Sequence, residues 1–147
     1  MTIRKWIKAD LGQIKGLLRQ LYETLGDGPI LEENTLLRHF KAMEENTDVY
    51  ENYVVTDNGS VVGYMSLLFY RSLFHAEGTA QINELVVDGK HRNKGYGKAL
   101  LQFGIQRAKD RGMDEIEIGV EKENMKALDF YKRNGIEEEY VLLGREL

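Results

Sequence analysis

The spacing of hydrophobic residues predicts a short strand and two helices at the start of the chain. Residues 2–7 alternate in character, which predicts a strand. Apolar residues then recur every three or four positions behind Asp10, a suitable N-cap, so we expect a helix from Asp10 to residue 22 or 25. Its apolar face consists of Leu11, Ile14, Leu17, Leu18 and Leu21. After a Gly-Asp-Gly-Pro loop at 26–29, a second helix is predicted from about 32 to 45.

The hydrophobic period then falls from 3.6 to two, which predicts strands. Residues 53–56 and 61–69 are the first two, and the Asp-Asn-Gly sequence at 57–59 predicts a hairpin turn between them. A third strand is predicted at 81–87, after a turn region around 75–78. We therefore expect an antiparallel arrangement in the middle of the chain.

The last third of the chain alternates between helical and strand patterns. A helix is predicted from about 96 to 111, where Gly112 ends it, and a strand follows at 115–120. Asn124 then caps a helix to about residue 133, and a final strand is expected at 139–146. The resulting order, β-α-α-β-β-β-α-β-α-β, predicts one mixed α/β domain over residues 1–147.

Composition excludes several classes of function. The chain has no cysteine, which excludes disulfides, thiolate catalysis and cysteine-ligated zinc, and its three histidines lack metal-ligand spacing. We therefore expect no metal. No apolar run has membrane-spanning length, and the first residues lack the apolar run of a signal peptide, so we expect a cytoplasmic protein without a membrane partner.

A glycine-rich segment at 88–98 carries the strongest chemical signal. It follows an apolar strand and precedes an amphipathic helix, so its backbone N–H groups and the helix dipole favour a phosphate ligand. Four cations lie in it, Lys90, Arg92, Lys94 and Lys98, although the chain has a net charge of −4. A local cationic site on an acidic chain favours a small polyanion over nucleic acid. A dinucleotide site is disfavoured because a third glycine and an early βαβ unit are missing.

Two motifs in this half of the chain resemble those of one enzyme family. Residues 92–97, Arg-Asn-Lys-Gly-Tyr-Gly, resemble the acyl-CoA motif of the GCN5-related N-acetyltransferases (GNAT), and residues 85–87 resemble the strand that precedes it. Residues 124–135 resemble the family's second signature, Asn-x-x-Ala-x-x-Phe-Tyr-x-x-x-Gly, with Ile136 where phenylalanine is usual. The resemblance covers the whole chain and implies the GNAT fold, a central, mixed and mostly antiparallel sheet flanked by helices.

The resemblance also implies acetyl-CoA as cosubstrate and assigns residues to it. Main-chain groups of the strand would hold the pantetheine arm, loop amides would hold the pyrophosphate, and glycines would allow the backbone to approach closely. The expected acetyl-CoA residues are Leu85, Val86, Val87, Arg92, Asn93, Lys94, Gly95, Tyr96, Gly97, Lys98, Asn124, Ala127 and Tyr131. The cations also fit an ordinary solvated surface, and Asn124 also fits a helix N-cap.

Two residues are candidate catalysts. Glu84 lies in mid-strand on the face predicted to hold Ile82 and Val86, and apolar surroundings suit a carboxylate that removes a proton from an ammonium. An ion pair or a solvent-facing position would explain Glu84 equally simply. Tyr131 matches the family tyrosine that protonates the departing thiolate, and otherwise would be core packing. Without cysteine, and without a serine in a nucleophile motif, we expect direct attack by the amine in a ternary complex.

The acceptor remains open between a small amine and a protein N-terminus or lysine. Acids near the first loop, at 23, 27, 32 and 33, would attract a cationic small molecule, although helix starts and surfaces often carry such residues. An acetyl-CoA-binding regulatory module without turnover is the alternative from another functional class. The family resemblance and possible edge strands near the C-terminus also suggest a homodimer.

Overall fold

A five-stranded sheet forms the centre of the computed structural model, which describes residues 1–24, 26 and 31–147. Its strands follow the order β1-β2-β3-β4-β5, and only the β4–β5 pair is parallel. The strands are β1 (Thr2–Lys5), β2 (Tyr50–Asp57), β3 (Ser60–Tyr70), β4 (Thr79–Val87) and β5 (Glu115–Ile118). Residue 25, one of the two predicted ends of the first helix, lies outside the described residues. So does most of the predicted loop at 26–29, including Asp27.

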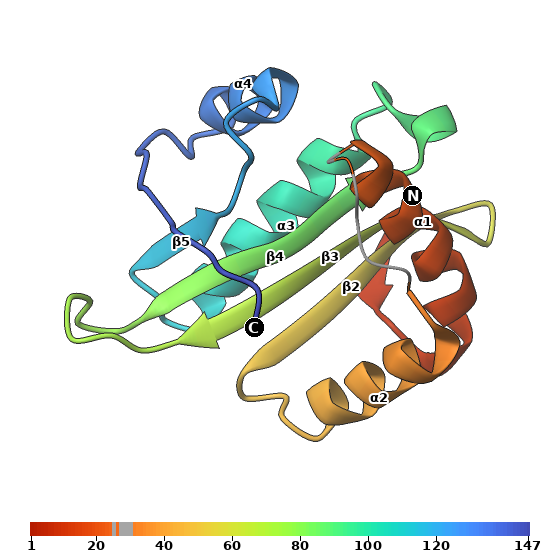
Figure 1. Ribbon diagram of the computed structural model, residues 1–147, viewed down its shortest axis with the longest axis horizontal. Coiled ribbons are helices and arrows are strands. Elements are labelled where there is room, and N and C mark those ends of the chain that lie inside the picture. Colours follow the sequence, from red (N-terminus) through yellow and green to blue (C-terminus); the bar gives the residue numbers. More distant parts are fainter. Residues whose placement is uncertain (25, 27–30) are drawn as a thin grey trace.

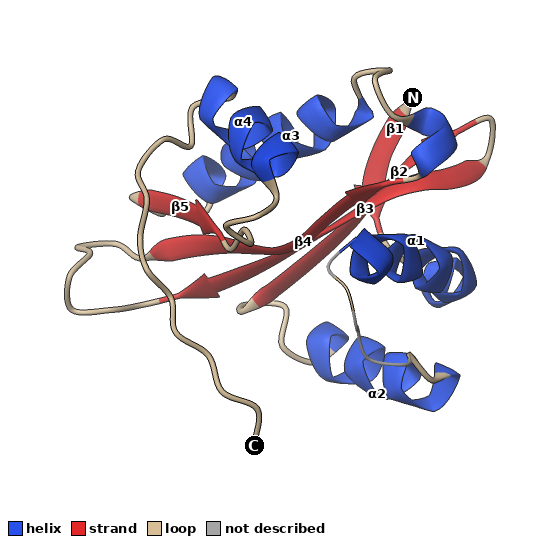
Figure 2. Ribbon diagram, turned by 45° about the horizontal axis from the view of Figure 1, so that its top comes forward, coloured by secondary structure: helices blue, strands red, loops and turns tan. Residues whose placement is uncertain are grey.

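Two helices cover each face of the sheet (Figures 1 and 2). The helices are α1 (Leu11–Thr24) and α2 (Glu33–Glu44) on one face, and α3 (Tyr96–Asp110) and α4 (Met125–Arg133) on the other. Short 3-10 turns occupy Lys8–Asp10 and Gly89–His91. Asp10 precedes α1 as predicted, but its carboxylate accepts hydrogen bonds from Arg4 and from the Ile7 amide.

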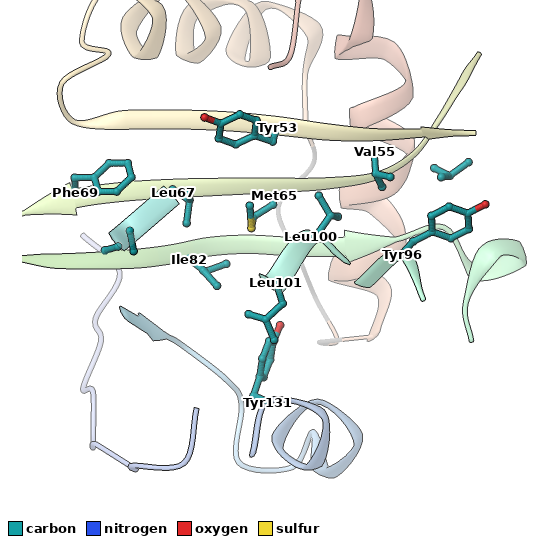
Figure 3. Packing of buried hydrophobic residues seen from close by; sticks show 13 residues of the cluster. Tyr53, Val55, Met65, Leu67, Phe69, Ile82, Tyr96, Leu100, Leu101 and Tyr131 are labelled. Carbon is teal, nitrogen blue, oxygen red and sulfur yellow. The ribbon is translucent and has the colours of Figure 1, made fainter. Parts of the chain in front are cut away.

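Each face of the sheet has its own hydrophobic core. The α1–α2 side buries Trp6, Ile14, Leu17, Leu18, Val54, Val61, Tyr64 and Val86. The larger core on the α3–α4 side includes Met65, Leu67, Ile82, Leu100, Leu101 and Tyr131 (Figure 3). The periodic leucines of α1 therefore point to the sheet as the sequence predicts. The β2–β3 hairpin is also confirmed, with positive φ at both Asn58 (48°) and Gly59 (79°), as a type I′ turn requires.

A bulge in β4 corrects the face predicted for Ile82. Ser66 pairs with Glu84, whereas Leu67 pairs with Ile82, so Asn83 has no partner of its own on β3. This extra residue turns Ile82 into the α3-side core, where it is 1% exposed. Glu84 shares the opposite face with Val86, but not with Ile82.

The predicted final strand at 139–146 is wrong. The chain has no helix or strand after α4, and the apolar residues of this segment are exposed. Its sequence suits a strand, but a strand also needs a partner for its backbone. The segment instead crosses the sheet and ends on the side of α1 and α2 (Figures 1 and 2). The observed element order therefore lacks the last β of the predicted order.

Candidate functional site

The β4 and β5 strands stay paired for only part of their length. Their parallel pairing runs from Thr79 opposite Glu115 to Ile82 opposite Ile118, and β5 ends there. β4 continues to Val87 but pairs only with β3 over this stretch. Alternate backbone groups at 83–87 therefore face the former β5 side without a strand partner among the described residues. Leu85, Val86 and Val87, the residues expected to hold a pantetheine arm, all lie on this open length.

The loop after β4 leads directly into the N-terminus of α3. Gly95 is the N-cap residue, with a left-handed φ of 86°, and no side chain caps the helix. The first-turn amides of an α-helix have no acceptor within the helix, and the helix dipole adds positive potential there. Residues 92–95 are exposed beside these amides. The predicted phosphate-binding segment thus has the geometry of an anion site.

Hydrogen bonds from other elements hold this loop in place. Gln20 of α1 donates to the Asp88 carboxylate and accepts from the Gly89 amide, both at 2.9 Å. The hydrogen bond from Gln20 is the largest cause that lowers the pKa of Asp88, and a hydrogen bond from His91 is the next. His91 Nδ1 lies 2.6 Å from the Asp88 carboxylate. Tyr96 is 9% exposed and donates to Asp57 at 2.8 Å, so its side chain anchors α3 and only its backbone faces the loop.

The four cations of the loop are exposed, and none of them forms an ion pair with another residue that the structure describes. Arg92 and Lys94 flank the exposed Asn93, whose φ of 61° contributes to the turn, and Lys90 and Lys98 lie on either side. Some other arginines of the described chain do pair with carboxylates, as Arg4 does with Asp10 and Arg107 with Glu51. Unpaired cations beside free helix-terminal amides suit a polyphosphate.

The two loop glycines differ in what the protein itself requires of them. The positive φ of Gly95 disfavours any residue with a Cβ. A Cβ at Gly97 would meet Phe130 and Val87 at 3.7 Å, an ordinary contact distance. The fold therefore tolerates alanine at Gly97, and close approach of a ligand is the remaining reason for glycine there.

This difference gives a testable pair of variants. Gly95→Ala is expected to lower the free energy of unfolding by about 1 kcal/mol, whereas Gly97→Ala leaves it unchanged or raises it slightly. Both variants should weaken acetyl-CoA binding. Urea denaturation and calorimetric titration measure the two effects separately. Wild-type affinity in a stable Gly97→Ala protein would show that no ligand approaches the backbone at this position.

Helix α4 and its N-cap carry the residues that resemble the second family signature, and these residues lie toward α3 and the sheet. Asn124 is the N-cap, and its side chain accepts a hydrogen bond from the Ala127 amide at 3.2 Å. Ala127 is partly buried against the α3-side core. Tyr131 is 8% exposed, and burial raises its pKa to about 12. Figure 3 shows its hydroxyl directed from α4 toward Leu101.

Glu84 lies on the opposite face of the sheet from Tyr131, among other polar residues. The buried Ser66 hydroxyl donates to its carboxylate. The neighbouring Tyr64 is buried and donates to Asn52 at 2.8 Å. Burial first, and then the charge of Glu84, raises the pKa of Tyr22 on α1 and of Tyr64. Glu84 is thus half-buried in a tyrosine-lined site, and its hydrogen bond to Ser66 replaces the ion pair considered from the sequence.

The β4 bulge is the local feature that positions Glu84. The sequence does show a serine within an apolar strand, which could have suggested a polar partner for Glu84. Only the strand register, however, places Ser66 opposite Glu84. Of the acids predicted near the first loop, Glu23, Glu32 and Glu33 are exposed. Within the described residues, no group of three or more His, Asp or Glu side chains is placed to hold a metal ion. In the same part of the chain, no helix is both long and apolar enough to cross a membrane.

Residues 17–136 match the sequence profile described as the acetyltransferase (GNAT) family. The chain belongs to the GNAT family. The fold and the family resemblance are therefore confirmed, and acetyl-CoA is the acetyl donor of this family.

Three similar proteins illustrate the relationship. An uncharacterized N-acetyltransferase of Methanocaldococcus jannaschii is 32% identical over 97% of this chain and 63% of its own length. The aminoalkylphosphonate N-acetyltransferase of Salmonella typhimurium is 32% identical over 61% of this chain and 58% of its own length. The chain thus spans less than two thirds of each of these curated relatives. A crystal structure of a transcriptional regulator from Bacillus halodurans is 25% identical, covers 99% of both chains and has a TM-score of 0.88.

Proposed function

We propose that this GNAT protein is an acetyl-CoA-dependent N-acetyltransferase that acts on a small primary amine. The observation that carries this proposal is the unpaired length of β4, which the loop at 88–95 connects to the N-terminus of α3, where no side chain caps the helix. An extended molecule with amide groups can pair with the free backbone of β4, and a pyrophosphate can bind at the N-terminus of α3. An acetylated thiol at the end of the pantetheine arm supplies an activated acyl group when bound.

The residues proposed to hold acetyl-CoA fall into three groups. Main-chain groups of Leu85, Val86 and Val87 contact the pantetheine arm. Amides and cations of residues 92–98 contact the phosphates. Asn124, Ala127 and Tyr131 of α4 lie across from β4, and we assign them to the thiol-bearing end of the arm. Asn124 also caps α4, so one side chain serves both roles if its second oxygen lone pair faces the ligand.

Glu84 is proposed as the general base. An amine is an ammonium ion at neutral pH, and it cannot attack a carbonyl until a proton is removed. Ser66 holds the Glu84 carboxylate in one orientation, and the charge of the carboxylate acts on Tyr22 and Tyr64. Among the described residues, the carboxylate has no cationic partner. An unpaired carboxylate in an aromatic site attracts a cationic amine and accepts its proton. The amine then attacks directly, without an acyl-enzyme.

Tyr131 is proposed as the proton donor to the leaving thiolate. With a pKa of about 12, its hydroxyl is fully protonated at neutral pH. Glu84 and Tyr131 lie on opposite faces of the sheet, on either side of the point where β5 leaves β4. Base and acid would therefore approach the thioester from different directions, the base at the amine nitrogen and the acid at the leaving sulfur.

A small amine is favoured as acceptor by the further acids on the face that carries Glu84. Glu115 and Glu117 pair in register with Thr79 and Gln81 and lie on this face, and Tyr70 donates a hydrogen bond to Glu117. The name of the Salmonella relative also specifies a small aminated acceptor. A protein N-terminus or lysine is the alternative acceptor, and we assign the reaction to the cytoplasm.

A thermal melt with and without acetyl-CoA is the first test. Ligand at ~100 times its dissociation constant should stabilise the protein by about 2.7 kcal/mol, which corresponds to a rise of several degrees in Tm. NADH and a short DNA duplex are the controls and should leave Tm unchanged. No shift with millimolar acetyl-CoA would contradict the proposed site.

A regulatory role is the second candidate function, because the similar Bacillus halodurans structure is described as a transcriptional regulator. A regulator of this kind would bind acetyl-CoA without consuming it. Release of free thiol during incubation with a panel of primary amines separates the two functions. Saturable binding of acetyl-CoA without thiol release from any amine would favour the regulatory module.

A further inference from the structure

Segment 88–98 contains a single acidic residue, Asp88, which directly follows β4. The proposed phosphate site lies in the same segment, so a free carboxylate here would repel a polyanion. Both oxygens of the Asp88 carboxylate are held by other side chains. Gln20 Nε2 donates to Asp88 Oδ1 at 2.9 Å, and His91 Nδ1 lies 2.6 Å from Asp88 Oδ2. The protein therefore keeps the one unfavourable charge of this segment in contacts of its own.

Gln20 contacts the start of the loop with both polar atoms of its side-chain amide. While Nε2 donates to the Asp88 carboxylate, Oε1 accepts from the Gly89 backbone amide at 2.9 Å. The main chain of Asp88 is bonded as well. Its amide donates to the Val62 carbonyl at 2.9 Å, and its carbonyl accepts from the His91 amide at 2.8 Å. Gln20 therefore fixes both the side chain of Asp88 and the path of the chain that leads to the proposed phosphate site.

Helix α1 gives Gln20 a fixed position. Leu17 and Leu18 of this helix are 4% and 6% exposed and belong to the core on the α1–α2 side. A second glutamine, Gln13, lies seven positions earlier, about two helical turns away, and accepts a hydrogen bond from the Val61 amide at 2.9 Å. The two glutamines thus make the same kind of contact from the same helix, Gln13 to β3 and Gln20 to segment 88–98.

We propose that Gln20 is a positioning residue for acetyl-CoA, which holds the start of the loop so that the amides and cations of residues 92–98 meet the phosphates together. A loop that is held in its binding conformation before the ligand arrives loses less conformational freedom on binding, which raises the affinity. Gln20 acts through Asp88 and Gly89 and not through a contact with the ligand. The proposal rests on the acetyl-CoA site proposed above, and it adds a residue that neither family motif contains.

Calorimetric titration of acetyl-CoA into the wild type, Gln20→Ala and Gln13→Ala is the first test. Gln20→Ala should bind about tenfold more weakly than wild type, a loss that corresponds to about 1.4 kcal/mol. Gln13→Ala is the matched control, because it loses a hydrogen bond from the same helix without touching the loop, and it should bind as wild type does. Wild-type affinity in Gln20→Ala, or an equal loss in Gln13→Ala, would overturn the proposal.

The wild-type titration separates failure of this proposal from failure of the proposed function. A wild-type protein without affinity for acetyl-CoA would remove the acetyl-CoA site and, with it, the role of Gln20. A wild-type protein that binds acetyl-CoA, together with a Gln20→Ala variant that binds it equally well, would leave the site standing and overturn only the role of Gln20.

A double-mutant cycle tests whether Gln20 acts through Asp88. In a chain that carries Asp88→Ala, adding Gln20→Ala should lower the affinity for acetyl-CoA much less than it does in the wild-type chain, because the contact between the two side chains is already lost. An undiminished further loss would show that Gln20 acts independently of Asp88, and would overturn the proposal.

Nitrogen-15 NMR of the ligand-free proteins gives a readout that a loss of stability alone would not produce. Gln20→Ala should shift the backbone amide signals of residues 88–95, whereas Gln13→Ala should shift signals of α1 and β3 and leave those of the loop unchanged. Weaker binding of acetyl-CoA by Gln20→Ala with unchanged loop signals would show that the loop keeps its conformation without Gln20, and would overturn the proposal.

Discussion

Replacing Glu84 with glutamine is expected to lower kcat for acetyl transfer by about 10²–10⁴-fold, the usual range for loss of a general base. Glutamine keeps the size of the side chain and accepts the Ser66 hydrogen bond, but it cannot take a proton from the ammonium. Binding of acetyl-CoA should not change, because the assigned contacts lie on other residues. Steady-state kinetics with an amine whose acetylation releases the CoA thiol measures kcat. Calorimetric titration measures the binding of acetyl-CoA.

The pH dependence of the Glu84→Gln variant separates a base from a structural residue. As pH rises, a growing fraction of the amine loses its proton in solution, so the variant should recover part of its rate. Glu45→Gln, at an exposed position after α2, is the matched control and should keep wild-type kinetics. A Glu84→Gln protein with undiminished kcat at neutral pH would refute the assignment and favour a water chain as proton acceptor.

The sequence predicts those parts of the fold that depend on local patterns. The helical spacing of the leucines in α1 and the Asn58-Gly59 turn each specify a local conformation, and both are confirmed. The glycine-rich loop is equally local, because Gly95 adopts a φ that other residues avoid. The loop and the α4 signature were therefore recognisable before any pairing between distant elements was known.

Strand partners and registers are not local, and the wrong predictions arise from them. The bulge at Asn83 depends on which residues of β3 oppose β4, and a pattern of period two cannot show an inserted residue. For the same reason the sequence placed Ile82 beside Glu84 and did not identify Ser66. The segment after α4 has the composition of a strand, but composition does not supply a partner.

A buried ion pair between β2 and α3 also escaped the sequence analysis, because its members are more than fifty residues apart. Glu51 is 5% exposed and accepts from Arg107 Nε and Nη2, each at 2.9 Å, and from Arg111 at 3.1 Å. Tyr53 adds a hydrogen bond at 2.7 Å. Burial acts to raise the pKa of Glu51, but the hydrogen bonds from Arg107 and Tyr53 and the positive charges lower it overall. The carboxylate therefore fastens α3 to the sheet.

Replacing Glu51 with alanine is expected to lower the free energy of unfolding by about 3 kcal/mol, the lower end for breaking a buried pair, because both arginines keep some access to solvent. Asp110→Ala is the matched control. Asp110 also contacts Arg107, at 3.3 Å, but its side chain is 46% exposed, so its loss should cost at most about 1 kcal/mol. Urea denaturation at neutral pH compares the two, and equal losses would show that burial does not set the strength of the pair.

The cost of Glu51→Ala should also depend on pH. Because the folded protein lowers the pKa of Glu51, the unfolded chain binds its proton first as pH falls. The stabilisation is thus fully present above the pKa of the unfolded chain, about 4.3 for glutamate, and is lost as pH falls through the lower folded value. The difference between wild type and Glu51→Ala in urea should therefore be constant from pH 6 to 8, to within about 0.5 kcal/mol, and shrink below about pH 4. A difference that stays constant in acid would assign the loss to packing, since removal of methylene groups does not depend on protonation.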